Sequence, residues 1–325
     1  MIRAKTILAL LSLAAPAVAG DIPLAPPIDC TLGETCFIQN YVDRDPGPGA
    51  ADFACGGLTY DGHKGTDFAL PTEADMARGV SVLSVAPGTV KATRDGMPDI
   101  AMDRPGAPAL DGRDCGNGVV VSHGEGWETQ YCHLREGSVA VRKGMRVAKG
   151  TVLGQVGLSG RTEFPHVHLS VRRDGRVVDP FDPASGPATC GRAAAAPLWQ
   201  NPLPYAPGGL VGAGFSTTVP GFDAVKAGLA SPATLPAGAP ALVLWAHAFG
   251  GRAGDAVAFE IDGPGGARIF EHRATLDRAQ VRFFRAAGRR PPAGGWPDGA
   301  YRGTAQLMRG DEVLGQRTVT LRIGG

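Results

Sequence analysis

The sequence has no excess of charge of either sign and few aromatic residues. Its 32 Lys and Arg residues are balanced by 31 Asp and Glu residues, and Phe, Trp and Tyr together make up 6% of 325 positions. Proteins that bind nucleic acid usually carry a basic face. The composition therefore predicts no nucleic-acid partner.

Long hydrophobic runs are also missing, apart from a short one at the N-terminus. Arg3 and Lys5 precede an apolar run from Ile7 to Leu13, and small residues follow at positions 17–19. This order predicts a secretory signal peptide over residues 1–19 and a periplasmic or secreted protein. A membrane-anchoring helix is the alternative, but the run is short for a bilayer span, so we expect no stable membrane insertion.

The sequence contains no CxxC pair, so a structural zinc site is the weaker explanation of its six cysteines. An even number of cysteines in an exported chain favours disulfides, although sequence alone cannot choose among the pairings. A hairpin turn at residues 123–126 would place the two cysteines that flank it nearly opposite each other, and two others are close in sequence. The pairings that we expect are Cys115–Cys132, Cys30–Cys36 and Cys55–Cys190.

No stretch of useful length has the 3.6-residue apolar periodicity of an amphipathic helix. Glycine and proline are abundant instead, with 48 and 27 residues, and follow no collagen-like period. Short apolar and β-branched segments lie between these turn formers, which predicts an all-β fold. The strands expected before residue 175 are Thr66–Leu70, Val80–Val85, Gly88–Ala92, Asn117–Ser122, Glu128–His133, Val152–Val156 and His166–Val171.

The length suggests two domains. Residues 20–60 are rich in Pro and Asp and are expected to form an N-terminal lead-in, followed by a first β domain over residues 61–190. Residues 191–240 are expected to be a linker and irregular segment. Alternation at Val257, Phe259 and Ile261, and similar patterns later, predict a small β-sandwich-like domain over residues 241–325. This second domain is interpreted as a structural or binding module.

Five residues of the first domain have the composition of a catalytic metal site. His166 and His168 would leave a strand on the same face, which suits a metal ligand with a catalytic base beside it. His63 and Asp67 could reach the same cation, and His133 ends the expected hairpin. Two imidazoles and a carboxylate suit zinc, and three protein ligands leave a fourth position for water. Taken singly, each histidine could equally be an ordinary surface or core residue.

The order and spacing of these residues resemble the LytM/lysostaphin-type zinc metalloendopeptidases. The resemblance rests on His63-x-x-x-Asp67, Tyr131-x-His133-Leu134 and His166-x-His168, with supporting phrases at residues 118–124 and 149–160. It covers about residues 61–183. It implies a compact antiparallel β catalytic domain, a duplicated hybrid motif, with its site in a groove. Members of this family cut peptide bonds of bacterial peptidoglycan.

The resemblance also implies a role for each of the five residues. His63, Asp67 and His168 would bind one Zn²⁺ per chain. His166 would be the general base, and His133 would position the polarised water or stabilise the developing oxyanion. Independently of the family, zinc lowers the pKa of bound water towards about 7, and an imidazole that titrates near this pH can move the proton.

Two features depart from the family pattern. Glu163 and Phe164 precede the His-x-His pair where small residues are usual, and residues 97–114 form an irregular loop that would border the same groove. Both bear on groove shape and substrate preference. The acids of this loop have no calcium-loop spacing, so we interpret it as a solvated loop at the edge of the cleft.

The function expected from the sequence is an exported zinc endopeptidase of peptidoglycan, acting on D,D-cross-links. The alternative is a non-enzymatic wall-binding regulator or activator of another cell-wall hydrolase, because some relatives have lost zinc ligands. Retention of all five residues favours the enzyme. A protein partner could bind through the C-terminal domain.

Overall fold

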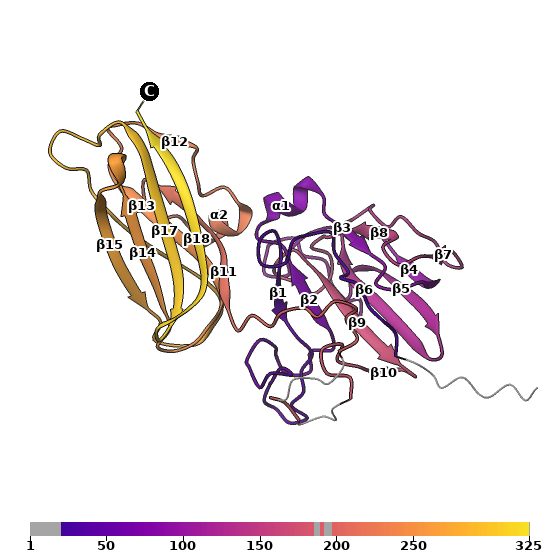
Figure 1. The fold of residues 1–325 in the computed structure, drawn as a ribbon. Coiled ribbons are helices and arrows are strands. Elements are labelled where there is room, and N and C mark those ends of the chain that lie inside the picture. Colours follow the sequence, from indigo (N-terminus) through magenta and orange to yellow (C-terminus); the bar gives the residue numbers. More distant parts are fainter. Residues whose placement is uncertain (1–20, 185–188, 192–196, 325) are drawn as a thin grey trace, which may run out of the picture.

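The computed structural model describes residues 21–184, 189–191 and 197–324. The expected signal peptide lies outside these residues. Within them the structure contains no helix that combines the length and apolar character needed to cross a membrane. The described chain is almost entirely antiparallel β-structure, as the sequence predicts, and Figure 1 shows its two β parts side by side.

The first part is built on an eight-stranded sheet with the order β1-β2-β9-β6-β5-β4-β7, in which β10 pairs with β9. Strand β9 lies near the centre, antiparallel to both β2 and β6. A two-stranded sheet, β3-β8, and helix α1 complete this part. The bounds are β1 Phe37–Asn40, β2 Thr66–Ala69, α1 Glu73–Arg78, β3 Ser81–Leu83, β4 Gly88–Arg94, β5 Asn117–Gly124, β6 Trp127–Leu134, β7 Arg146–Val147, β8 Val152–Gln155, β9 His166–Arg173 and β10 Arg176–Val177.

Alternate side chains of strand β9 face the core on one side and the candidate site on the other. Val167, Leu169 and Val171 are fully or almost fully buried and belong to the main core of this part. His166 and His168 are at the intervening positions, so they leave the opposite face of the strand. The same residues that anchor the strand therefore present both histidines in one direction.

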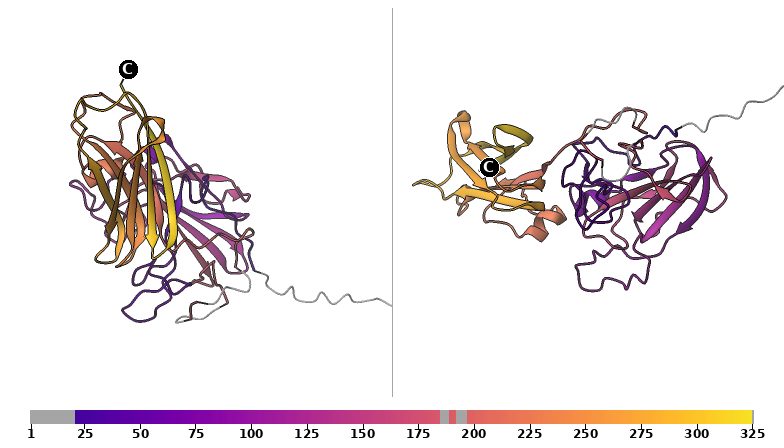
Figure 2. Two further views of the ribbon diagram at one scale, coloured as in Figure 1. Left: turned by 60° about the vertical axis from the view of Figure 1, so that its left-hand side comes forward. Right: turned by 90° about the horizontal axis from the view of Figure 1, so that it is seen from below.

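The second part is a sandwich of a three-stranded sheet, β11-β13-β16, and a five-stranded sheet, β12-β18-β17-β14-β15. Both sheets contribute to one buried cluster, which includes Leu244 from β13 and Phe259 from β14. Figure 2 shows the two layers of this sandwich from a second direction. The bounds are β11 Gly209–Ser216, α2 Phe222–Ala227, β12 Thr234–Leu235, β13 Leu242–Gly251, β14 Ala256–Asp262, η1 Pro264–Gly266, β15 Arg268–Thr275, β16 Gln280–Arg289, β17 Gly299–Arg309 and β18 Glu312–Ile323.

Two segments in which no strand was predicted contain strands. The lead-in over residues 20–60 supplies β1, which pairs with β2, and the irregular segment over residues 191–240 supplies β11, which pairs with β13. Strand β1 is only four residues long, and β11 contains three glycines, which weaken a strand pattern. The division of the chain into domains stays a prediction.

The three expected disulfides are present in the structure: Cys30–Cys36, Cys55–Cys190 and Cys115–Cys132. The third bond joins the end of β6 to the segment before β5, directly next to His133. The backbone N–H of His133 donates to the carbonyl of Cys115 at 2.9 Å. This disulfide therefore holds the backbone from which one candidate catalytic side chain projects.

We expect replacement of Cys115 and Cys132 by Ala to lower the free energy of unfolding by about 3 kcal/mol. The reason is that the unfolded chain regains the conformational entropy that a closed loop of this size removes. Replacement of Cys30 and Cys36 removes a shorter loop and should cost about 2 kcal/mol. Urea titrations of the two double variants measure both effects. A larger loss for the Cys30 and Cys36 variant would contradict this ranking.

Candidate functional site

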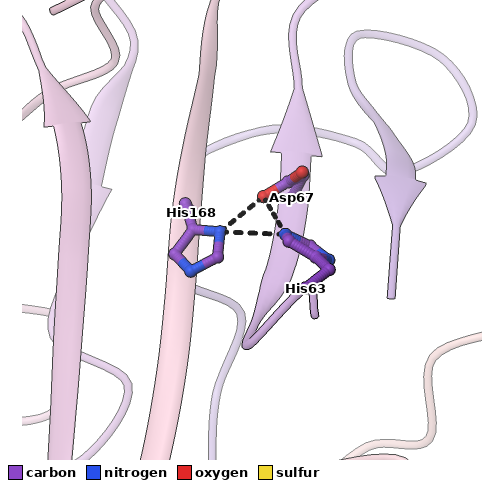
Figure 3. A group of neighbouring side chains, drawn as sticks. All are labelled: His63, Asp67 and His168. Atoms are coloured by element: carbon purple, nitrogen blue, oxygen red, sulfur yellow. Dashed lines mark hydrogen bonds and ion pairs between the residues drawn. The ribbon is translucent and has the colours of Figure 1, made fainter. Parts of the chain in front are cut away.

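Three side chains from two neighbouring strands and the loop before them converge on one point (Figure 3). The register of β2 and β9 places Asp67 directly opposite His168. His63 lies in the loop that precedes β2, which begins at Thr66. Asp67 Oδ1 is 2.8 Å from His168 Nδ1 and 3.2 Å from His63 Nε2, and the two nitrogens are 3.1 Å apart. These are the three residues that the sequence predicts as metal ligands.

Outer hydrogen bonds orient the first two side chains. His63 Nδ1 is 2.6 Å from the carbonyl oxygen of Tyr41, so this nitrogen carries the proton and donates it. The lone pair of His63 is therefore on Nε2, which faces the cluster. Asn40 Nδ2 donates to Asp67 Oδ2 at 2.9 Å, which leaves Oδ1 for the cluster. Asn40 and Tyr41 come from the segment expected to be a lead-in, so sequence analysis missed them.

The third side chain is oriented by a relay on its own strand. Ser170 Oγ donates to the carbonyl oxygen of Lys64 at 2.6 Å and can therefore accept from His168 Nε2, at 3.2 Å. This places the proton of His168 on Nε2 and its lone pair on Nδ1, which faces the cluster. A serine two residues after a histidine shares its strand face, so this partner could have been found in the sequence.

The donor set fits a divalent metal ion. Three electron-pair donors converge within 4.8 Å of one another, each fixed by a partner outside the cluster. Two imidazole nitrogens and one carboxylate oxygen are ligands that zinc accepts, and outer hydrogen bonds of this kind are typical of metal-binding histidines. His63, Asp67 and His168 could therefore hold such an ion.

The two other predicted histidines lie beside this cluster. The ring centroids of His133 and His166 are 4.6 Å apart, and His166 Nε2 is 3.5 Å from Asp67 Oδ1. His166 Nδ1 donates to the carbonyl oxygen of Phe164 at 2.9 Å, and His133 Nδ1 donates to that of Ser159 at 2.7 Å. Each ring therefore keeps a lone pair on Nε2.

Burial and neighbouring charges set the protonation of these groups. Burial lowers the pKa of His133 well below the ordinary histidine value, and it also lowers the pKa of His166. Burial disfavours charge on Asp67 as well, but electrostatic interaction with the neighbouring imidazoles and hydrogen bonds from His168 and His63 hold its pKa well below the usual range. The site thus combines a carboxylate with two neutral imidazoles.

Two other histidines and the irregular loop expected from the sequence also have defined contacts. His123 has Pro87 O and Thr129 Oγ1 each at 2.8 Å from a ring nitrogen. His247 is buried on the face of β13 that packs against helix α2, with its ring 5.4 Å from that of Phe222. The loop at residues 97–114 lies against the chain before β9, since the N–H of Met102 donates to Thr162 O and that of Arg161 to Asp114 O.

Comparison with known proteins identifies the first part of the chain. Residues 61–180 match peptidase family M23. Peptidoglycan DD-endopeptidase ShyA of Vibrio cholerae is 34% identical over 117 residues, which is 36% of this chain and 22% of that protein. The DD-carboxypeptidase/endopeptidase Mpg of Neisseria meningitidis is 41% identical over 69 residues, 21% of this chain and 15% of that protein. The chain thus covers only 15–22% of the length of these two relatives.

Solved structures include two with partial similarity. A zinc-containing peptidase from Vibrio cholerae is 26% identical, with a TM-score of 0.29 over 45% of this chain and 39% of the other. The catalytic domain of lysostaphin from Staphylococcus simulans is 18% identical, with a TM-score of 0.28 over 43% of this chain and 85% of that domain. The sequence match and the aligned DD-endopeptidases show that residues 61–180 are a peptidase family M23 domain.

Proposed function

We propose that this protein is an exported zinc endopeptidase that hydrolyses peptide bonds of bacterial peptidoglycan, in particular D,D-cross-links. The observation that carries the proposal is the convergence of three lone pairs, on His63, Asp67 and His168, beside two buried neutral histidines. The names of the aligned DD-endopeptidases support the substrate class and the type of bond. The three disulfides fit an oxidising compartment outside the cytoplasm.

The residues would divide the work as follows. His63, Asp67 and His168 would hold the zinc ion, which when bound supplies an acidified water and a Lewis acid for the scissile carbonyl. His166, neutral with a lone pair on Nε2, would accept the proton of the attacking water and deliver it to the leaving amine. His133 is also neutral with Nδ1 bonded to Ser159, so its Nε2 is an acceptor. This favours positioning of water over donation to an oxyanion.

Metal analysis combined with a digestion assay tests the proposal. The purified protein should contain about one Zn²⁺ per chain and should release peptides from purified sacculi. Loss of release on chelation and its return on addition of zinc would tie activity to the metal. If zinc-loaded protein leaves sacculi and short D-Ala-containing peptides intact, the proposal is wrong.

The outer partner of Asp67 should matter for metal affinity. We expect Asn40→Ala to lower zinc affinity by about 10- to 100-fold, because the carboxylate loses the hydrogen bond that directs Oδ1 into the cluster. Competition with a chromophoric chelator measures the change. Asn201→Ala, at an exposed asparagine, is the matched control and should leave affinity unchanged. Equal affinities for the two variants would contradict the orienting role.

Zinc affinity should also depend on pH. Burial lowers the pKa of His63, but the charge and hydrogen bond of Asp67 outweigh it and raise this pKa above the ordinary histidine value. A proton on His63 competes with zinc for the same lone pair. Affinity should therefore begin to fall near neutral pH, by about tenfold per unit for each proton displaced. An affinity that stays constant from pH 8 to pH 6 would contradict this expectation.

A further inference from the structure

The C-terminal sandwich contacts the M23 domain directly beside the candidate site. The guanidinium carbon of Arg282, on β16, lies 4.9 Å from the ring centre of Phe164 and 5.9 Å from that of Phe37. Phe164 in turn stacks on His166, with ring centroids 4.5 Å apart. Two ring contacts therefore connect an arginine of the sandwich to the proposed general base. Phe164, which departs from the family pattern, is the residue between them.

Arg282 is a cation with unmet hydrogen-bonding capacity. Its Nε and Nη1 are hidden from solvent and have no acceptor in the described part of the chain. Its Nη2 is 3.3 Å from Nε2 of His247, a residue whose pKa burial lowers to about 2, so that histidine is a neutral acceptor. Glu73 is the acid that acts on Arg282 electrostatically, but both of its oxygens accept from Arg104, at 2.6 and 3.1 Å.

The surroundings of Arg282 disfavour the charged form of its side chain. Burial lowers the pKa of Arg282 to about 10, which is a measure of how poorly its charge is solvated. The faces of Phe164 and Phe37 offset part of this cost through cation–π attraction. They accept no conventional hydrogen bond, so the donors on Nε and Nη1 stay unsatisfied.

A hollow in the surface surrounds this arginine. Arg278 and Arg285 line it together with Arg282, and Phe222 and Phe284 supply apolar walls. No acidic residue of the described chain lines it. Lys226, on the neighbouring helix α2, is compensated by Asp223 at 2.9 Å, whereas the three arginines have no such carboxylate among the described ion pairs. The hollow is therefore a concentrated, uncompensated positive site.

We propose that this hollow binds a carboxylate of the acidic stem peptide, with Arg282 as the central contact. The inference rests on the proposed function, because it treats the peptide as the substrate whose scissile bond lies at His166. Peptidoglycan stems carry free carboxylates close to their cross-links, and Arg282 is separated from His166 by one aromatic ring. The C-terminal sandwich would then select substrate, and the M23 domain would cut it.

Fluorescence anisotropy with two synthetic probes tests the subsite. The probes are a labelled uncrosslinked stem peptide with free carboxylates and the same peptide with every carboxylate converted to a carboxamide. The full-length protein should bind the carboxylate form about 10- to 100-fold more tightly, as expected for hydrogen bonds to a charged group. Arg282→Gln should remove most of this preference, and salt should weaken it.

Matched variants make the result specific. Arg322→Gln, at an exposed arginine of the other sheet, should keep the full preference. Because Arg282 is packed between the two β parts, the thermal stability of the Arg282→Gln variant should be measured alongside its binding. If Arg282→Gln does not fold, the double variant Arg278→Gln/Arg285→Gln replaces it and should reduce the preference at least about threefold by removing two nearby charges.

The outcomes separate the subsite from the proposed function. Equal binding of both probes by the wild-type protein overturns the subsite, and so does a preference that survives in the folded Arg282 variant or in the replacement double variant. If the protein digests sacculi but shows no preference for the carboxylate probe, the enzyme assignment stands and the subsite alone is refuted. An Arg282-dependent preference without digestion of sacculi would support the subsite and refute the proposed activity.

Discussion

His166→Ala is expected to lose cleavage of sacculi by about 10²- to 10⁴-fold, the usual contribution of a general base, while it retains zinc. The reason is the position of the ring. His166 lies 3.5 Å from Asp67 but directs its Nδ1 away from the cluster, to Phe164 O, and is not one of the three converging donors. Metal analysis and a sacculus digestion assay on the same sample measure both quantities.

Two variants make this expectation discriminating. His168→Ala removes a proposed ligand, so zinc and activity should disappear together. His123→Ala removes a hairpin histidine that is hydrogen-bonded to Pro87 and Thr129 and has no role in the proposed site. This variant should keep both zinc and activity. If His166→Ala loses zinc as completely as His168→Ala does, the division between ligand and base is wrong.

Gly65→Ala is expected to lower zinc affinity by at least about 10- to 100-fold without removal of any ligand. A methyl group at Gly65 would lie 2.5 Å from His168 Nε2 and 2.6 Å from the carbonyl oxygen of Leu169. The backbone cannot move easily at β9, so the imidazole must rotate away from Asp67. Overpacking of this kind should also destabilise the fold by about 1–3 kcal/mol.

The control is a glycine in the same segment with space around it. A methyl group at Gly57 would meet no atom within 4 Å, so Gly57→Ala should keep zinc and stability. Chelator competition and thermal melts on both variants give the comparison. A Gly65→Ala protein that binds zinc as tightly as the Gly57→Ala protein would show that the close approach at His168 is unimportant.

The sequence was most informative where pattern and chemistry coincide. Alternation through Val167, Leu169 and Val171 predicted β9 and the common face of its two histidines, and the structure has both. The hairpin predicted the Cys115–Cys132 bond. The five site residues were identified by order and spacing, and the structure brings all five together. Their catalytic roles stay predictions.

Long-range partners could not be read from the sequence. Strand β13 is buried on both faces, because Leu244 faces the sandwich core while Phe249 stacks on Phe37 of β1, with ring centroids 4.7 Å apart. Such a strand reads as a continuous apolar run without alternation. Asn40 holds Asp67 across 27 positions of sequence, and Arg282 reaches Phe164 across a much greater separation. No local pattern encodes these contacts.

The most direct test of the account is the composition of sacculus fragments after digestion with metal-free and zinc-restored protein. The account predicts that the zinc-restored protein converts cross-linked dimers into monomers, that the metal-free protein does not, and that His166→Ala with zinc bound is nearly inactive. Dimers that persist under zinc-restored wild-type protein, or that disappear equally without zinc, would contradict it.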